Sequence, residues 1–343
     1  MLAYSNPVYD GYFADPFVLK TQGVYYAYGT GHGPERDGRQ FPILRSTDLA
    51  TWSYVGGALA ALEPEAGSKP FTAYWAPEVA ERDGRFFMYY SAASGGDETH
   101  RLRVAISHSP EGPFIDVGRV KLSGDFADVF CIDASPFRDP ADGQWYLYFA
   151  TDFFTERVGT GTAVVPLADD MRSAAGPAKI VLRAAADWEI YERNRPLYGK
   201  IWAAWHTVEG PSVWRHEGRY YCFYSGGNWQ TELYGVGVGV ADQAMGPFTD
   251  LWSLQGPSVL RGVEGEILGP GHNCIVLGPD GQTEYIVYHA WDAARTARRM
   301  FIDPLRWEVD RQRGIPRPIC DGPTLGSAAR HARARKLERT EQT

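Results

Sequence analysis

A pattern of hydrophobic and polar positions occurs five times along the chain. Each copy has a short apolar stretch, a polar turn that usually contains glycine, and a second stretch rich in aromatic and β-branched residues. The copies begin at residues 14, 76, 133, 210 and 271, and the third reads DASPFRDPADGQWYLYFATD. Short apolar stretches on either side of a glycine-containing turn are typical of a β-hairpin. The pattern therefore predicts five hairpins.

Further strands are predicted after some of these hairpins. ILRSTDLATWSYVG from residue 43, VAISHSPEGPFIDVG from 104 and VGVADQAMGPFTD from 238 each read as strand, turn, strand. No long stretch has a helical period. Five units of about four antiparallel strands predict an all-β, five-bladed β-propeller. Two β-sandwiches are the alternative, but they repeat single strands rather than whole sheets. We expect one catalytic domain over 1–322 and a charged, flexible tail over 323–343.

The first strand of each propeller blade lines the central axis, so residues at its start can converge although they are distant in sequence. Units one, three, four and five carry Asp15, Asp133, Glu209 and His272 there, and unit two carries Trp75. Any one of these carboxylates, taken alone, is more commonly a turn cap or a surface charge. Three carboxylates at matching places in a repeat would converge and repel one another, which shifts their pKa values. Because such arrangements are concentrated at functional sites, the cluster indicates a function.

Composition excludes several classes of function. The formal net charge is −8, and nucleic-acid binding needs a basic face. No apolar run is long enough for a membrane helix, and no signal peptide is visible, so we expect neither membrane association nor export but a cytoplasmic location. The four cysteines are far apart, lack a CxxC motif and indicate neither zinc nor redox chemistry. The sequence does not predict an oligomeric state.

The ordered motifs resemble those of glycoside hydrolase family 43. They are ADP after an N-terminal NPV, then WAPEV, IDASPFRDPADGQWYLYF, VEGPSVWRHEGRYYCFYSGG and GPGHNCIV, and they extend from about residue 6 to about residue 307. The resemblance implies a five-bladed propeller that hydrolyses furanosides or xylosides with inversion. It also implies that Asp15 is the general base, Glu209 the general acid and Asp133 the residue that tunes and orients the acid. His272 would be the axial histidine that often lies beside an ion or water.

The chemistry of inversion agrees with these assignments. One carboxylate must activate water while a protonated carboxyl group delivers a proton to the leaving oxygen. Room for the water places the two groups roughly 6.5–9.5 Å apart. We expect Asp133 to raise the pKa of Glu209 by repulsion, while Asp15 stays ionised. No cofactor is required for this chemistry. A structural calcium ion at the propeller axis, near His272 and bound largely through water, is a further expectation.

Substrate-binding residues are predicted with less support from the sequence. Trp75 is the best-placed aromatic platform for a sugar ring, and Trp229 is a candidate for the pocket rim. Similar family members place an arginine after the fifth hairpin, and we select Arg298 over Arg295 and Arg299. Blade packing for the tryptophans, and a surface salt bridge for each arginine, are the structural alternatives.

Glu209 has the same two following residues as Glu111, since both precede Gly-Pro. The counterpart of Glu111 in the fourth unit is Met245, in the sequence QAMGPF, and methionine cannot transfer protons. We therefore interpret Glu111 as a surface turn residue.

These observations predict an inverting exo-glycosidase that releases a terminal pentose from plant cell-wall oligosaccharides. α-L-Arabinofuranosides are the first expectation, β-D-xylosides and internal cleavage of arabinan the alternatives. The longest interval between units lies between the third and fourth and could cover one side of the funnel, which favours exo action. A retaining, fructosidase-like propeller would use Asp139 in FRDP, but that residue is predicted in a turn. A carbohydrate-binding propeller without turnover would be expected to lack one of the three carboxylates.

Overall fold

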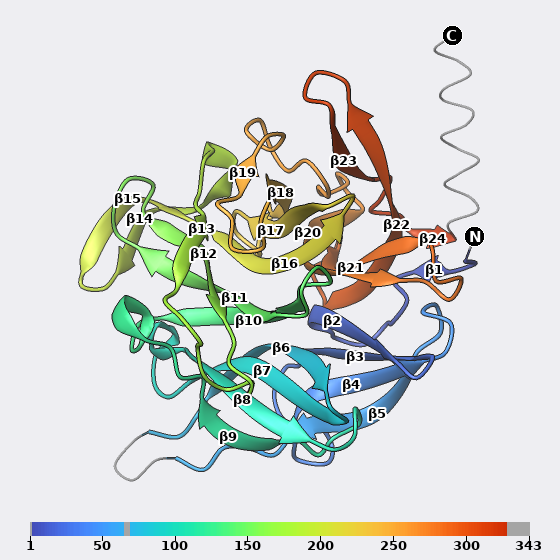
Figure 1. The fold of residues 1–343 in the computed structure, drawn as a ribbon. Coiled ribbons are helices and arrows are strands. Elements are labelled where there is room, and N and C mark those ends of the chain that lie inside the picture. The colour runs from blue at the N-terminus through green and yellow to red at the C-terminus, as the bar shows by residue number, and fades with distance from the viewer. Residues whose placement is uncertain (1, 65–68, 328–343) are drawn as a thin grey trace.

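The five-bladed propeller predicted from the repeat is confirmed. The computed structural model describes residues 2–64 and 69–327, and its five main sheets follow one another in chain order around a central axis (Figure 1). The innermost strands contact one another in a closed ring. Three short 3-10 helices are the only helices among the described residues, η1 (Asp97–Thr99), η2 (Gly124–Phe126) and η3 (Asp187–Glu189).

Four of the blades have four antiparallel strands. Blade one consists of β2 (Ala14–Thr21), β3 (Val24–Thr30), β4 (Gln40–Ser46) and β5 (Ser53–Leu59). Blade two consists of β6 (Ala73–Arg82), β7 (Arg85–Ala93), β8 (Arg101–Ser107) and β9 (Ile115–Arg119). Blade four consists of β16 (Val208–His216), β17 (Arg219–Gly226), β18 (Gly235–Ala241) and β19 (Thr249–Asp250). Blade five consists of β20 (Ile267–Leu277), β21 (Glu284–Asp292), β22 (Arg298–Asp310) and β23 (Ile315–Cys320).

Blade three carries an additional hairpin in the long interval that the sequence showed before the fourth unit. Its core strands are β10 (Cys131–Arg138), β11 (Trp145–Phe153), β12 (Gly159–Pro166) and β13 (Lys179–Leu182). The hairpin consists of β14 (Ile190–Leu197) and β15 (Lys200–His206), and β15 is bridged to β12. This hairpin projects at the left of Figure 1 and leads directly into β16.

Both ends of the described chain are held by blade five. β1 (Ser5–Asn6) pairs with β24 (Gly326–Ser327), and the Asn6 side chain bonds to both backbone groups of Ile302 on β22. The N-terminal segment thus contacts the earlier half of β22. Residues 323–327 were predicted to begin the tail, but they pack against the propeller; 328–343 lie outside the described residues.

A buried carboxylate organises this closure. Asp303 on β22 is fully buried and accepts four hydrogen bonds. The donors are the hydroxyl groups of Tyr4 (2.9 Å), Tyr288 (2.7 Å) and Thr324 (2.7 Å) and the Thr324 backbone N–H (3.1 Å). The N-terminal segment, two strands of blade five and the C-terminal segment therefore share one acceptor.

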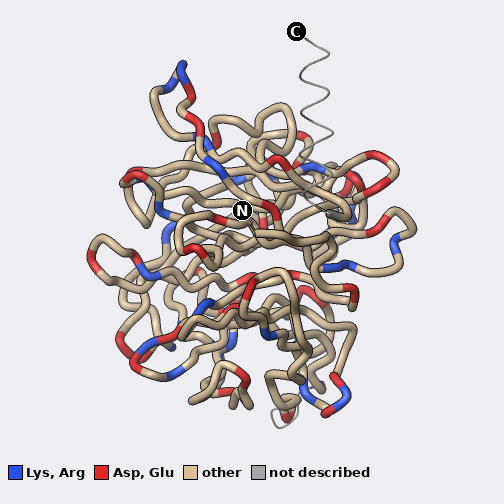
Figure 2. The backbone as a smooth tube through the Cα atoms, turned by 90° about the vertical axis from the view of Figure 1, so that its right-hand side faces the viewer, with Lys and Arg blue, Asp and Glu red and all other residues tan. Residues whose placement is uncertain are grey.

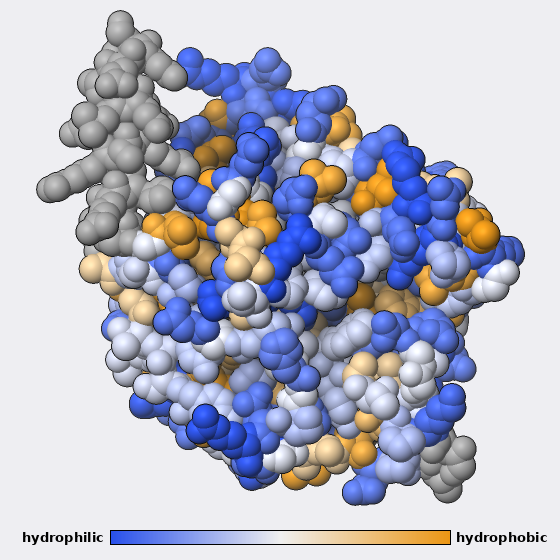
Figure 3. All heavy atoms as spheres, turned by 180° about the vertical axis from the view of Figure 1, so that it is seen from behind, coloured by the Kyte–Doolittle hydropathy of each residue, from blue (hydrophilic) through white to orange (hydrophobic). Residues whose placement is uncertain are grey.

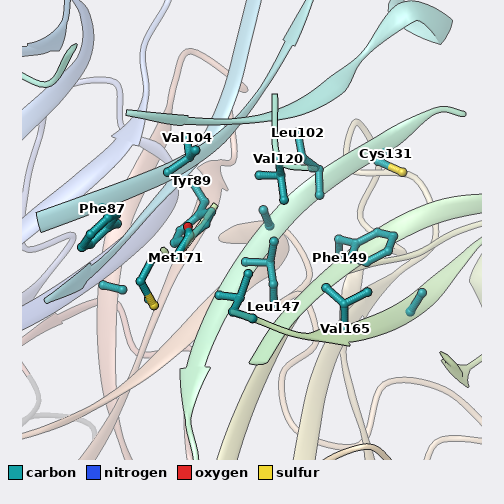
Figure 4. Packing of buried hydrophobic residues seen from close by; sticks show 14 residues of the cluster. Phe87, Tyr89, Leu102, Val104, Val120, Cys131, Leu147, Phe149, Val165 and Met171 are labelled. Carbon is teal, nitrogen blue, oxygen red and sulfur yellow. The ribbon is translucent and has the colours of Figure 1, made fainter. Parts of the chain in front are cut away.

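The hydrophobic core is divided into five clusters, each between two neighbouring blades. Figure 4 shows the cluster between blades two and three, where Tyr89 and Val104 meet Leu147, Phe149 and Val165. These inward faces of successive sheets lose contact with water together, which is the main favourable term in holding one blade to the next.

The surface carries residues of both charges. Acidic and basic residues are interspersed over the loops in Figure 2. No helix in the described part of the chain is long and apolar enough to cross a membrane. Cys131, Cys222 and Cys274 are buried thiols outside any disulfide, and Cys320 is partly buried.

We expect Asp303→Asn to lower the free energy of unfolding by about 2–3 kcal/mol, because an amide nitrogen would then face buried donors that lose their acceptor. Urea unfolding measures the change. Glu308→Gln is the control, since this residue lies on the same strand with a side chain that is 62% exposed. Equal stability of the two variants would contradict a role for Asp303 in closing the ring.

Candidate active site

Each innermost strand has a two-residue β-bulge, where two residues face one residue of the next strand. The first bulge residue is left-handed in every blade, with φ between 48° and 57°. The five pairs are Asp15–Pro16, Ala76–Pro77, Asp133–Ala134, Gly210–Pro211 and His272–Asn273. Proline is tolerated at a bulge because it donates no ladder hydrogen bond there.

The bulge frees the backbone N–H of its left-handed residue. In four blades, a side chain of the preceding blade accepts a hydrogen bond from this N–H. These bonds are Ala76 N–H to Thr30 Oγ1 (2.8 Å), Gly210 N–H to Asp133 Oδ2 (2.9 Å), His272 N–H to Ser225 Oγ (2.7 Å) and Asp15 N–H to His289 Nδ1 (3.0 Å). In blade three the matching place on β11 is occupied by Ala150, which has no side-chain acceptor. The N–H of Gly210 in blade four therefore donates its hydrogen bond to the Asp133 carboxylate instead.

The bulges correct the alignment made from the sequence. Asp15, Asp133 and His272 occupy the left-handed position, but in blade four this position belongs to Gly210. Glu209 precedes it and is therefore equivalent to Trp75. Residues other than glycine occupy this left-handed position in the other blades, so the φ of 56° alone does not select Gly210; the His272 ring, which lies 3.2 Å from the place of a Cβ atom, favours glycine there.

All seven residues predicted for the site line one pocket of about 450 Å³. They are Asp15, Trp75, Asp133, Glu209, Trp229, His272 and Arg298. His32 also lines it and stacks against Tyr12 with ring centroids 3.6 Å apart. The convergence of residues from all five blades follows from the ring of innermost strands.

Asp15 is held in its ionised form. Burial alone would raise its pKa, but Arg298, His272 and His289 lower the pKa well below its ordinary value. Arg298 Nη1 lies 3.2 Å from Asp15 Oδ1. Burial lowers the pKa of His272, and lowers that of His289 to about 4, so both imidazoles are neutral at pH 7. Arg298 is therefore the cation that balances the charge of Asp15.

Glu209 is shifted in the opposite direction. Burial, with a smaller effect of Asp15, raises the pKa of its carboxyl group to about 7. The Tyr234 hydroxyl donates a hydrogen bond of 2.8 Å to Glu209 Oε1 and opposes this rise, because it stabilises the ionised form. Glu209 can thus carry a proton near neutral pH while Asp15 cannot.

Asp133 has a raised pKa as well. Burial is the largest cause, followed by the charges of Glu209 and Asp15. The sequence led us to expect repulsion from Asp133 to raise the pKa of Glu209, but burial is the main cause. The bond from Gly210 N–H to Asp133 instead ties Asp133 to the backbone next to Glu209.

His272 lies beside two of the carboxylates in the pocket. Its Nδ1 atom lies 3.5 Å from Asp15 Oδ1 and 4.0 Å from Asp133 Oδ2. Among the described residues, no group of three or more His, Cys, Asp or Glu side chains is arranged to hold a metal ion. A calcium ion near His272 would have to be held mainly by water and backbone oxygens, and it stays a prediction.

The aromatic and basic residues predicted for substrate binding have additional neighbours. Trp75 stacks on the buried His100 ring at 3.7 Å, and Trp229 stacks on Trp291 at 6.0 Å. Arg298 was predicted to be the substrate-binding arginine. It binds the Tyr12 hydroxyl at 2.8 Å as well as Asp15, and its guanidinium lies 4.4 Å from the Trp229 ring centroid.

Several other residues lie away from the pocket lining. Arg295 pairs with Glu232, and Arg299 pairs with Asp292. Glu111, the second glutamate before Gly-Pro, is exposed and lies 3.7 Å from Arg45. Asp139 is buried in blade three, where it accepts a hydrogen bond from Tyr220.

Sequence reasoning missed one wall of the pocket. The β14–β15 hairpin and the neighbouring end of β11 contribute Tyr191, Arg195, Tyr198, Trp205 and Asp152. The stretch AAADWEIYERNRPLYGKIWAAWH was expected to cover one side, but its side chains could not be assigned without the strand register. Tyr12 and Tyr234 were also missed, since nothing in their local sequence distinguishes them from core tyrosines.

Known proteins resemble the chain over nearly its whole length. The model of Glycosyl hydrolases family 43 matches residues 4–312. A β-D-galactofuranosidase of Aspergillus niger is 31% identical and covers 85% of this chain and 78% of its own. An extracellular exo-α-(1→5)-L-arabinofuranosidase of Streptomyces chartreusis is 28% identical, with 84% and 82% covered. The crystal structure of a thermostable family-43 glycoside hydrolase is 30% identical, covers 94% and 96%, and has a TM-score of 0.77.

We expect Tyr234→Phe to move the alkaline limb of the kcat/KM profile to higher pH by about one unit, because Glu209 loses a donor to its ionised form. In the unaltered protein, kcat/KM should fall above pH 7, since the pKa of Glu209 is about 7. The profile is measured with a nitrophenyl glycoside.

Tyr221→Phe is the control for this change. It removes a buried tyrosine hydroxyl that donates to Pro316 O at 2.8 Å instead of to Glu209. An alkaline limb that moves downward, or moves equally in both variants, would contradict the role given to Tyr234.

Proposed function

This chain belongs to glycosyl hydrolase family 43, and we propose that it is an inverting, exo-acting glycosidase that releases terminal α-L-arabinofuranosyl groups. Arabinan and arabinoxylan oligosaccharides from plant cell walls are the proposed substrates. The observation that carries this proposal is one pocket with two carboxyl groups whose pKa values are shifted in opposite directions. Asp15 is kept ionised by Arg298, and Glu209 can stay protonated near pH 7.

In the proposed reaction, Asp15 takes a proton from a water molecule as that water attacks the anomeric carbon. Glu209 donates its proton to the leaving oxygen as the glycosidic bond breaks. The products are the free sugar with inverted configuration and the shortened chain. Asp133 is proposed to position Glu209 through the Gly210 N–H, and neutral His289 to position Asp15 through the Asp15 N–H.

Exo action is supported by the wall of the pocket. The β14–β15 hairpin borders the lining on the side of blades three and four, and the 3-10 helix η1 contributes Asp97 and Glu98. Such a wall favours a terminal sugar over the interior of a long chain. Stacking of the sugar on Trp75, which His100 supports from behind, is the proposed contact with its apolar face.

A β-D-galactofuranoside is a second candidate substrate, because the Aspergillus niger relative is named for that activity. The two furanosides have the same ring configuration and differ in the length of the exocyclic chain. β-D-Xylosides and internal cleavage of arabinan are further alternatives. Rates on nitrophenyl α-L-arabinofuranoside, β-D-galactofuranoside and β-D-xyloside distinguish the terminal sugars, and a dyed arabinan distinguishes internal cleavage.

Inversion is tested by NMR of the first product. We expect hydrolysis of an α-L-arabinofuranoside to give the β anomer before mutarotation, because the water and the leaving oxygen occupy opposite faces of the sugar. Initial appearance of the α anomer would exclude Asp15 as a base that acts through water. Binding of arabino-oligosaccharides without any product would instead favour a carbohydrate-binding propeller.

We expect Glu209→Gln to lower kcat/KM on oligosaccharides by about 10²–10⁴-fold, because glutamine cannot protonate the leaving oxygen. Hydrolysis of a dinitrophenyl glycoside should fall much less, since its leaving group needs no proton. Glu111→Gln is the matched control, because this exposed glutamate also precedes Gly-Pro. Equal losses on both substrates would exclude Glu209 as the general acid.

A further inference from the structure

The β14–β15 hairpin lies on the side of the pocket where a leaving group must depart. β15 ends at His206, and β16, which carries Glu209, begins at Val208. The general acid protonates the oxygen that stays with the leaving group, so that group has to lie beside the acid. Tyr191, Arg195 and Leu197 share one face of β14 and line the pocket there.

Polar groups beside this face can bind sugar hydroxyls. The Arg195 guanidinium lies 4.4 Å from the Tyr191 ring centroid and 5.3 Å from that of Trp205. Asp152 lines the pocket and accepts bonds from Tyr198 (2.7 Å) and Thr160 (3.2 Å), and each carboxylate oxygen has capacity for a further donor. A guanidinium and a carboxylate together can bind both oxygen atoms and hydroxyl hydrogens.

Aromatic rings continue outward from these groups. Tyr198 and Trp205 line the pocket, and Phe154 contacts both of them at centroid distances of 5.4 and 6.3 Å. Phe154 is 52% exposed and Tyr198 is 39% exposed. Hydrophobic residues are visible on this side of the molecule, at the right of Figure 3. Exposed aromatic faces that continue from a sugar pocket are suited to a further sugar ring.

The backbone at Tyr198 gives an independent reason to assign it a function. Tyr198 and Gly199 form the two-residue turn of the hairpin, with φ values of 54° and 70°. Such a turn favours Asn-Gly or Asp-Gly, because a bulky side chain is strained in the left-handed region. Tyrosine is therefore a costly choice for the turn alone, and strain of this kind is concentrated at functional sites.

We propose that the β14–β15 hairpin forms a binding site for the leaving-group part of a carbohydrate chain, with room for at least two sugar units. Arg195 and Asp152 bind the first unit, and the rings of Tyr198 and Phe154 bind the second. This inference rests on the proposed function and specifies its substrate: the leaving group is a neutral oligosaccharide rather than a single sugar or a small alcohol. Tyr198 and Phe154 then determine chain-length preference.

The alternative is that the aromatic cluster only attaches the hairpin to blade three. That role is already filled by Trp205, which is 1% exposed and contacts Phe154, Tyr198 and Trp202. The exposed faces of Phe154 and Tyr198 add little to such packing. The two interpretations differ in what a change at position 198 does to stability and to substrate preference.

The test compares substrates that differ only in the leaving group. kcat/KM is measured on the nitrophenyl glycoside and on oligosaccharides of two to five units, α-1,5-arabino-oligosaccharides for an arabinofuranosidase or β-1,4-xylo-oligosaccharides for a xylosidase. We expect kcat/KM to rise by about tenfold from two to three units, when a second leaving-group sugar is present, and to change little afterwards.

Two variants and a matched control assign this rise to the hairpin. Tyr198→Asn and Phe154→Ala should each reduce the ratio of kcat/KM on the trisaccharide to that on the disaccharide by about threefold or more. Tyr198→Asn should not lower the melting temperature, because asparagine tolerates the left-handed conformation. The control is Tyr54→Asn, since Tyr54 is 41% exposed and also donates to a carboxylate, Glu35, at 2.8 Å.

The outcomes separate this inference from the proposed function. Hydrolysis of a nitrophenyl glycoside without any dependence on chain length would overturn the leaving-group site and leave the glycosidase assignment intact. Failure to hydrolyse any glycoside or oligosaccharide would overturn the proposed function itself. A lower melting temperature for Tyr198→Asn with an unchanged trisaccharide-to-disaccharide ratio would show that the tyrosine is structural.

Discussion

The left-handed bulge in each innermost strand is the constraint on which the site depends. A regular strand would alternate its side chains between the two faces of the blade, and only the bulge directs adjacent residues toward the axis. The constraint has a cost, because Asp15, Asp133 and His272 adopt a conformation that disfavours side chains. Hydrogen bonds from the freed N–H groups to the preceding blade offset part of that cost and fix each bulge relative to its neighbour. The same contacts that shape the backbone therefore set the spacing of the functional groups.

Charge balance then determines which carboxyl group can act as an acid. Three carboxyl groups face one pocket, where Arg298 is in contact with Asp15 and the two nearby histidines are neutral. Arg298 touches Asp15, so that residue keeps the negative charge. Tyr234, Arg298 and Arg195 lower the pKa of Glu209 only in part, and burial makes both Glu209 and Asp133 ionise less readily. Direct contact with Arg298 thus distinguishes Asp15 from the other two carboxyl groups.

The sequence predicted the propeller and the convergence of five site residues, Asp15, Trp75, Asp133, Glu209 and His272, because both follow from repetition. Arg298 was selected through the family resemblance, and Trp229 only as a candidate for the rim. The sequence did not reveal that Glu209 lies one residue before the bulge position that Asp15 and Asp133 occupy in their own blades. A bulge inserts residues into a strand without a recognisable pattern in the local sequence. The hydrogen bond from Gly210 N–H to Asp133 depends on Ala150 in another strand. The sequence alone suggested instead that Asp133 raises the pKa of Glu209 by charge repulsion. Tyr234 and the pocket-lining side chains of the β14–β15 hairpin were missed for the same reason: their places in the pocket depend on how distant strands pair.

The two sides of the pocket are built from different parts of the ring. The side of the base comes from blades one and five, where His289 and Arg298 contact Asp15 and where both chain ends are held by β22. The side of the acid comes from blade four and the hairpin that precedes it, a single segment from Ile190 to Glu209. A change in the hairpin can therefore alter which leaving group is bound without moving the base or its arginine. By contrast, a change in the closure of the ring would displace β22, and with it the cation that keeps Asp15 ionised.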